Sequence, residues 1–224
     1  MTSPGKCNVC GGVFEKPKMM RHLKKCLAAS EPTGPPRAGS GQNEKVSLIF
    51  VEATHLPDYW LYVEVPASAP LWRLDAFLRR IWLECCEHMS AFNFADGIVR
   101  FCPTYEEDFD GRQDDPLGRV APAGTKFSHE YDFGTPTYLS LRVVAEREAP
   151  PEKATKTQES VVRLLARNEQ PPVKCRCGGK ATSACRTCDE WICDECSKGH
   201  PCGVDPLLPV VNSPRTGVCG YTGR

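Results

Sequence analysis

The sequence lacks the features that would place it among membrane or exported proteins. No apolar run in its 224 residues approaches the roughly 18 needed to cross a bilayer. The N-terminus has no apolar stretch of the kind that signal peptides carry, so we expect the protein in the cytoplasm. Net charge is also absent, because 28 Lys and Arg balance 28 Asp and Glu. With 41% hydrophobic and 25% charged residues, the composition is that of a soluble globular protein.

Cysteine, by contrast, is abundant, with 14 residues. A secreted protein would use them as a disulfide framework, but no export signal is visible and most of the cysteines stand in short pairs beside histidine. In a reducing compartment such pairs indicate metal ligation, and thiolate with imidazole is the ligand set of structural zinc. Iron is an alternative at an all-cysteine site, whereas histidine favours zinc.

Eight of these ligands crowd into residues 173–224. They form four short pairs, which are Cys175 and Cys177, Cys185 and Cys188, Cys193 and Cys196, and His200 and Cys202. The gap between the second and third pairs is too short for neighbouring pairs to close on one ion. The spacing therefore predicts a cross-brace, in which the first and third pairs share one zinc ion and the second and fourth share another. Cys219 is left over, and it is an alternative ligand in place of His200 or Cys202.

Residues 1–27 carry a second ligand pattern. Cys7 and Cys10 precede His22 and Cys26, which are four residues apart and therefore share one face of a helix. Phe14 stands where two-strand-and-helix fingers place a core aromatic residue. The pattern predicts a Cys2HisCys zinc finger, which brings the expected total to three zinc ions.

Charge is unevenly distributed along the chain. Residues 1–27 hold six Lys and Arg against Glu15, whereas residues 28–172 hold 15 basic and 22 acidic residues. A basic finger on an acidic body is the better candidate for contact with a polyanion. The residues that we expect to contact nucleic acid are Lys16, Lys18, Arg21, Lys24 and Lys25. One finger reads only about 3 base pairs, so protein contact or a purely structural finger is the alternative.

Residues 28–43 are rich in Pro, Gly and Ser, and predict a flexible linker that tethers the finger loosely. Strands are predicted in the next segments from their β-branched and aromatic residues, at 46–51, 59–65, 97–101, 126–133 and 137–145. Between the second and third strands, apolar residues recur at helical spacing from Leu71 to Cys85. Residues 104–118 are acidic and predict a loop. The order predicts an α+β domain over 44–148, with helices on one side of the sheet.

The remaining segments connect the central domain to the cysteine pairs. Residues 149–172 predict a connecting segment with a short strand at 161–166, which ends at Pro171 and Pro172. The two-zinc module with its tail occupies residues 173–224, and we expect the apolar stretch 207–211 to pack against another part of the protein.

The central domain contains residues of catalytic type without a catalytic motif. Cys85, Cys86 and His88, with His129 and Asp132, offer metal ligands and nucleophiles. We favour a structural interpretation, because Cys85 continues the apolar stripe of the helix and His88 stands at its end, where an imidazolium favours the helix dipole. One alternative is a metal site in the central domain, besides those of the finger and the C-terminal module. An enzyme is another, and it would require His88, His129 and Asp132 to converge in one pocket.

Residues 44–148 also resemble a known family. The likeness rests on Val65-Pro66-Ala67, on Leu71, Leu74 and Ile81, on His88-Met89 with Phe92, on Gly124 with Lys126-Phe127, and on Tyr131-Asp132-Phe133-Gly134. In these the chain resembles the Ri-plasmid open-reading-frame-three family, some of whose members are labelled TnpR-like. The C-terminal cysteine pairs and the ending VVNSPRTGVCGYTG are similar to a zinc-bearing subgroup. The resemblance implies an α+β fold and no particular activity.

The sequence thus predicts a cytoplasmic, non-enzymatic, multi-zinc protein that binds nucleic acid through its N-terminal finger. The first alternative is a zinc-stabilised protein–protein adaptor. The second is an enzyme of the central domain, associated with mobile elements or recombination. A recombinase would need a Ser or Tyr nucleophile among clustered arginines, and the arginines of this domain are scattered.

Overall fold

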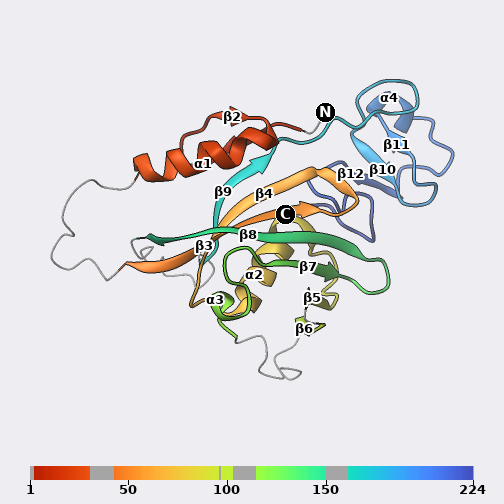
Figure 1. Ribbon diagram of the computed structural model, residues 1–224. Helices are drawn as coiled ribbons and strands as arrows, with labels where there is room; N and C mark the ends of the chain where they lie inside the picture. The colour runs from red at the N-terminus through yellow and green to blue at the C-terminus, as the bar shows by residue number, and fades with distance from the viewer. Residues whose placement is uncertain (1–2, 31–42, 96, 103–114, 150–160, 224) are drawn as a thin grey trace.

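The computed structural model describes residues 3–30, 43–95, 97–102, 115–149 and 161–223 (Figure 1). It is mostly sheet, with few helices. The main sheet is antiparallel and has nine strands in the order β2-β1-β9-β4-β3-β8-β7-β5-β6. The strands are β1 (Gly5–Cys7), β2 (Val13–Phe14), β3 (Glu44–Ala53), β4 (Leu56–Pro66), β5 (Ser90–Phe94), β6 (Val99–Cys102), β7 (Lys126–Tyr131), β8 (Thr137–Ala149) and β9 (Arg163–Asn168).

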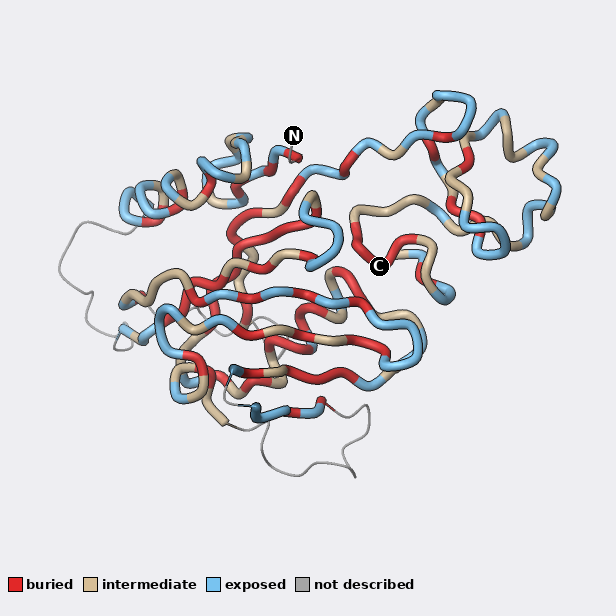
Figure 2. The backbone as a smooth tube through the Cα atoms, turned by 45° about the vertical axis from the view of Figure 1, so that its right-hand side comes forward, coloured by how far each residue is buried: buried red, intermediate tan, exposed pale blue. Residues whose placement is uncertain are grey.

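Two apolar layers cover the middle of this sheet, one on each face. On β4, Leu61 and Val63 belong to the larger cluster, whereas Trp60 and Tyr62 alternate with them and belong to a second cluster. The helix α2 (Leu71–Leu78) and the π-helix η1 (Arg79–Leu83) pack on the first face. Because both faces are covered, β4 is a nearly continuous buried run rather than an alternating one (Figure 2).

The second face is covered by the N-terminal segment, which corrects the expectation of a loosely tethered finger. Met19, Leu23 and Leu27 form one stripe of the helix α1 (Lys16–Ser30) and are buried in the cluster that contains Trp60. The strand β1 pairs with β9, and the Trp60 indole N–H donates to the carbonyl of Ser3 over 3.0 Å. The finger is therefore a layer of the body (Figure 1). The helices of the central domain share one face of the sheet, as predicted, and α1 from the N-terminal segment covers the other.

The predicted helix from Leu71 to Cys85 is also corrected. Helical geometry ends at Leu83, after a π-turn in which the N–H of Glu84 donates to the carbonyl of Arg79. The Arg79 side chain binds both Asp75 and Glu84, and so fixes this ending. Cys85 and His88 therefore lie in the loop before β5, and neither the helical stripe nor the helix terminus accounts for them.

Other boundaries differ less. The strand β5 and the short helix α3 (Leu117–Val120) were not predicted, and the predicted strands at 97–101 and 161–166 begin two residues later as β6 and β9. Residues 28–30 of the expected linker belong to α1. Parts of three predicted segments lie outside the described residues. They are 31–42 of the linker, 104–114 of the acidic loop and 150–160 of the connecting segment. None of the described helices is long and apolar enough to span a membrane.

A smaller three-stranded sheet, β11-β10-β12, lies in the C-terminal part. It consists of β10 (Ser183–Cys185), β11 (Trp191–Ile192) and β12 (Leu207–Pro209), and the short helix α4 (Asp194–Ser197) follows β11. The apolar stretch 207–211 thus contributes the strand β12, which pairs with β10.

The contact between β1 and the sheet predicts a large effect of Gly5→Ala. A Cβ atom at this position would lie 2.6 Å from the carbonyl oxygen of Arg167 and would also overlap the Trp60 ring. We expect the free energy of unfolding to fall by about 1–3 kcal/mol, as in other overpacked cores. The control is Gly199→Ala, where no atom lies within 4 Å and the cost stays within about 0.5 kcal/mol. Equal unfolding midpoints for the two variants would contradict the docked finger.

Candidate metal centres

Four groups of cysteine and histidine bring their ligand atoms together, within 4.8 Å of one another in each group. The groups are Cys7, Cys10, His22 and Cys26; Cys175, Cys177, Cys193 and Cys196; Cys185, Cys188, His200 and Cys202; and Cys85, Cys86, His88 and Cys219. All 14 cysteines are free thiols, so no disulfide competes for the sulfur atoms. Each group can hold a metal ion with four protein ligands.

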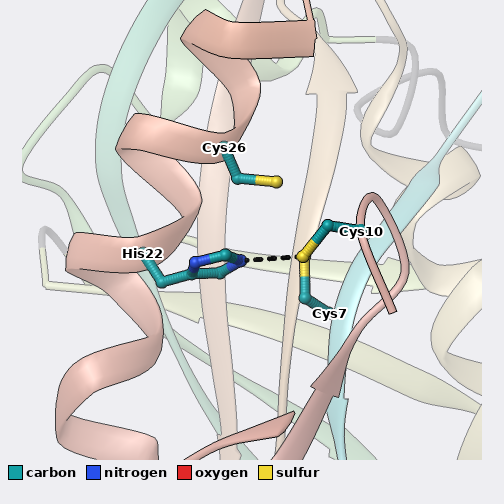
Figure 3. Close-up of side chains that lie close together, drawn as sticks. All are labelled: Cys7, Cys10, His22 and Cys26. Carbon is teal, nitrogen blue, oxygen red and sulfur yellow. Dashed lines mark hydrogen bonds between the residues drawn. The ribbon is translucent and has the colours of Figure 1, made fainter. Parts of the chain in front are cut away.

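The N-terminal group joins a hairpin to a helix (Figure 3). Cys7 and Cys10 flank a turn in which the N–H of Gly11 donates to the carbonyl of Cys7, and Gly11 adopts a φ of 78° that suits glycine. His22 and Cys26 project from successive turns of α1. The Cys10 sulfur lies 3.3 Å from Nε2 of His22. Zinc bonds of about 2.3 Å to sulfur and about 2.0–2.1 Å to nitrogen would put tetrahedral ligands roughly 3.5–3.8 Å apart, so the group is close to that size.

The C-terminal ligands form two groups that interleave along the chain. Cys175 and Cys177 meet Cys193 and Cys196, as the spacing of the pairs predicts. The sulfur atoms of Cys177 and Cys193 are 3.6 Å apart, and the Cys188 sulfur lies 3.5 Å from Nε2 of His200. Cys219 belongs to neither group, which removes the alternative that it replaces a ligand here.

Within each of the two C-terminal groups, the pKa values of the thiols are shifted in opposite directions. Backbone N–H groups of Cys177 and Cys193 lower the pKa of Cys175 to about 6. Hydrogen bonds to Cys177 and Cys193 raise the pKa of Cys196 to about 12. In the second group burial opposes ionisation of Cys185, yet the N–H of Cys188 and the hydrogen bond with His200 lower its pKa to about 6. Burial raises the pKa of Cys202 in the same group to about 11. Each group therefore forms a first thiolate readily and further ones with difficulty, and a divalent cation would remove that opposition.

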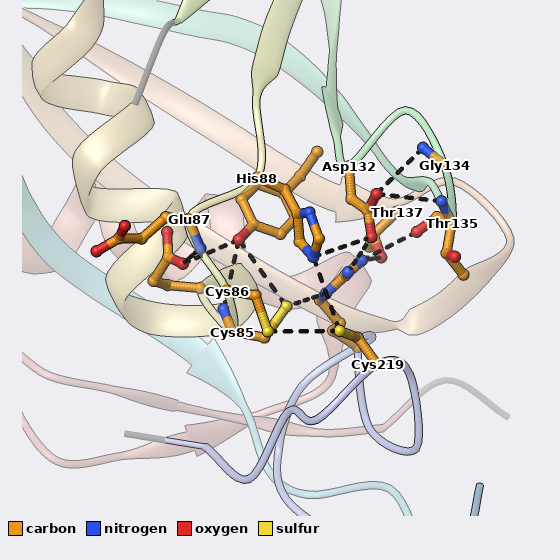
Figure 4. A network of polar contacts seen from close by, with 12 residues as sticks. Cys85, Cys86, Glu87, His88, Asp132, Gly134, Thr135, Thr137 and Cys219 are labelled. Carbon is orange, nitrogen blue, oxygen red and sulfur yellow. Dashed lines mark hydrogen bonds and ion pairs between the residues drawn. The ribbon is translucent and has the colours of Figure 1, made fainter. Parts of the chain in front are cut away.

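The fourth group was not predicted as a unit. Cys85, Cys86 and His88 lie in the loop between η1 and β5, and Cys219 comes from the C-terminal tail (Figure 4). The Cys219 sulfur is 3.6 Å from that of Cys86 and 3.7 Å from Nε2 of His88. The available signal was three ligand-type residues within four positions, together with one unassigned cysteine far along the chain.

Beside this group the tail inserts Arg215, whose side chain is fully buried. Its guanidinium donates to Oδ2 of Asp132, to the Thr135 carbonyl and Thr137 hydroxyl over 3.1 and 3.0 Å, and to the Cys85 sulfur over 3.4 Å. Although burial opposes ionisation of Asp132, the hydrogen bond from Arg215 and the N–H groups of the following turn hold its pKa below the ordinary value. Asp132 is thus a turn residue and also the counter-ion of Arg215 in the tail.

The residues of the enzyme alternative separate into two places. His129 is fully buried, and its Nε2 lies 2.7 Å from Oδ1 of Asp75. Burial opposes the charge of Asp75, but His129, Arg79 and Ser90 together keep its pKa below the ordinary value. His88 instead faces Asp132, with 3.5 Å between Nε2 and Oδ2. Among the described residues, the polar contact of His129 is to Asp75 and that of His88 is to Asp132, so the three residues of this alternative are engaged in two separate pairs.

The five basic residues of the finger differ in their surroundings. Lys16 is half-buried, forms an ion pair with Glu52 and donates to the carbonyl of Pro57 over 2.8 Å. Lys18 is exposed and pairs with Glu15 over 2.8 Å. Arg21, Lys24 and Lys25 are exposed on α1. Lys16 therefore links α1 to β3 and β4, and the other four basic residues remain at the surface.

Comparison with protein-family models and with curated proteins finds no match. Among solved structures, the chain is similar to a protein of unknown function from Methanosarcina mazei Go1, with 15% identity and a TM-score of 0.42. The aligned part covers 51% of this chain and 66% of that one, just under two thirds of its length. This likeness carries no argument about function, and the resemblance to the Ri-plasmid family remains a prediction.

The buried pair of Arg215 and Asp132 predicts a strong and specific destabilisation. Arg215→Met leaves the Asp132 carboxylate buried without its cation, so we expect a loss of about 3–5 kcal/mol. Adding Asp132→Asn should recover part of that loss, because asparagine is neutral and tolerates the φ of 65° found there. Arg176→Met is the control, since its pair with Glu190 is exposed and worth about 0–1 kcal/mol. Denaturant unfolding that shows equal losses for Arg215→Met and Arg176→Met would contradict this role.

Proposed function

We propose that the protein is a non-enzymatic, zinc-stabilised binding protein that contacts nucleic acid through the exposed face of α1. Its ions would be structural, because each site offers four protein ligands and leaves no position open for a substrate. Zinc is favoured over iron, because histidine belongs to the finger and to one of the two C-terminal groups. A reducing cytoplasm would keep the thiols free to bind it.

The position of Lys18 and Arg21 on α1 carries the nucleic-acid proposal. In two-strand-and-helix fingers the residues at −1, 3 and 6 from the helix start face the bases. Counted from Lys16, the first residue of α1, these are Glu15, Lys18 and Arg21, and all three are exposed. Docking on the sheet uses the opposite stripe of the helix, so the body leaves these positions uncovered.

The same face offers phosphate contacts. Lys25 follows Lys18 and Arg21 at helical spacing and therefore shares their side of α1, and Lys24 is exposed on its flank. The pair between Lys18 and Glu15 is exposed and weak, so a phosphate can displace it. Because the ligands His22 and Cys26 fix the helix to its hairpin, the basic side chains would be presented from a rigid support.

A protein–protein adaptor is the second candidate, and the edge of the main sheet favours it. The strand β6 is the last strand of that sheet, and its Val99 and Phe101 are exposed. Phe133 is exposed as well and contacts Phe101 with 6.0 Å between ring centroids. Edge strands with apolar side chains accept a further strand from a partner.

Salt dependence distinguishes the two candidates. We expect double-stranded DNA or RNA to bind more weakly as salt rises, since phosphate contacts release counterions. The triple variant Lys18→Gln, Arg21→Gln, Lys25→Gln should bind more weakly, and the slope of log K against log salt should fall by about 1 for each lost phosphate contact. Lys198→Gln, an exposed lysine paired with Glu195 in the C-terminal module, is the matched control. No binding of the unaltered protein at low salt would refute the proposal and favour the adaptor.

Metal removal tests the structural role of the ions. We expect a strong chelator to abolish the hydrogen-exchange protection of the small sheet, for example of the Thr182 and Val210 amides, which bond to Ile192 and Thr182. Amides of β3 and β4 should stay protected, because their strands are buried in the apolar clusters. Unchanged protection of Thr182 after the metal has left would contradict a structural role.

A further inference from the structure

The group made of Cys85, Cys86, His88 and Cys219 has the dimensions of the groups assigned above. Its contacts of 3.6 Å (Cys86 to Cys219) and 3.7 Å (Cys219 to His88) match the 3.6 Å and 3.5 Å found in the two C-terminal groups. They also lie within the roughly 3.5–3.8 Å expected between tetrahedral zinc ligands. Three thiolates and one imidazole are the same ligand set as that of the finger.

The backbone turns these side chains toward one another at some cost. Cys219 and Glu87 adopt φ values of 55° and 57°, in the left-handed region that non-glycine residues rarely occupy. In the loop, the N–H of Glu87 donates to Oε1 of Glu84 over 2.6 Å and closes a tight turn across Cys85 and Cys86. Left-handed geometry costs about 1–2 kcal/mol per residue, and metal–ligand bonds among the aligned side chains would offset that cost.

Arg215 supplies the outer contacts that a thiolate site needs. Its Nε donates to the Cys85 sulfur over 3.4 Å, and metal-bound thiolates and imidazoles are usually oriented by such bonds. A zinc ion with three thiolates would carry a net charge of −1, and the guanidinium that donates to one of these thiolates is shared with Asp132. Asp132 lies near His88, but its two oxygens already accept from Arg215, Gly134 and Thr135. The four-ligand set is therefore complete without the carboxylate.

We propose that Cys85, Cys86, His88 and Cys219 bind a further zinc ion, which fastens the C-terminal tail to the loop between η1 and β5. His88 and Cys219 are 131 positions apart, so the ion would cross-link distant parts of the chain. The proposal is independent of nucleic-acid binding.

The neighbouring tail contacts indicate what the ion would hold in place. The Ser213 hydroxyl donates to the carbonyl of Trp82 over 2.6 Å, and the Asn212 amide donates to the carbonyl of Asn168 over 2.8 Å. These contacts tie the tail to η1 and β9. The strand β12 is joined to the same tail, so the ion would fix how the C-terminal module attaches to the body.

The test is the number of zinc ions per chain, measured by native mass spectrometry on full-length protein purified without added metal. We expect four ions in the unaltered protein, three in Cys219→Ser and three in His88→Ala. His88→Cys keeps a ligand at that position and should retain four. Cys102→Ser is the matched control, because Cys102 lies outside all four groups and should leave four ions bound.

Three ions in the unaltered protein would overturn the proposal, and so would four ions in both Cys219→Ser and His88→Ala. Three ions together with a mass lower by two hydrogens would assign Cys86 and Cys219 to a disulfide instead, which also overturns it. If Cys219→Ser does not fold, the counts in the unaltered protein and in His88→Ala still decide. The nucleic-acid titration is separate, so its failure would leave this result unaffected.

Discussion

The shortage of apolar core in the outer parts of the chain is the constraint on which the rest of the structure depends. In residues 173–223 the buried hydrophobic side chains are few, and two of them, Cys175 and Cys185, are themselves ligands. Small segments of this kind do not stay folded by burial alone. Four ligand atoms brought to one point can bind a metal ion, and its metal–ligand bonds would replace the missing core and contribute directly to folding. The tight turns between the paired cysteines and the small sheet hold these ligand atoms close together.

The main sheet, by contrast, has an apolar core on each of its two faces. The helices α2 and η1 cover one face, and α1 with its hairpin covers the other. Because of this arrangement, the finger is part of the body rather than an independent module. It is fixed to Trp60 and to β9, Lys16 is used internally, and the side of α1 opposite the buried stripe stays exposed.

What could be predicted from the sequence depended on how local the determining contacts are. The finger and the interleaved pairs follow from short spacings, so their grouping was predicted, and β3, β4, β7 and β8 follow from their apolar patterns. The docking of the finger and the Cys219 group depend on contacts between distant segments, such as the hydrogen bond from Trp60 to Ser3. Cys85 was assigned to a helix because the stripe from Leu71 continues to it, whereas the π-turn at Arg79 and its bonds to Asp75 and Glu84 end the helix earlier.

The most direct test of the account is X-ray absorption at the zinc edge of the full-length protein. It reports the identity, number and distance of the atoms bound to the metal, averaged over all sites. The account predicts a first shell dominated by sulfur at about 2.3 Å, with a minority of nitrogen at about 2.0–2.1 Å from imidazole. A shell dominated by oxygen, or the absence of zinc from protein that is nevertheless folded, would contradict it.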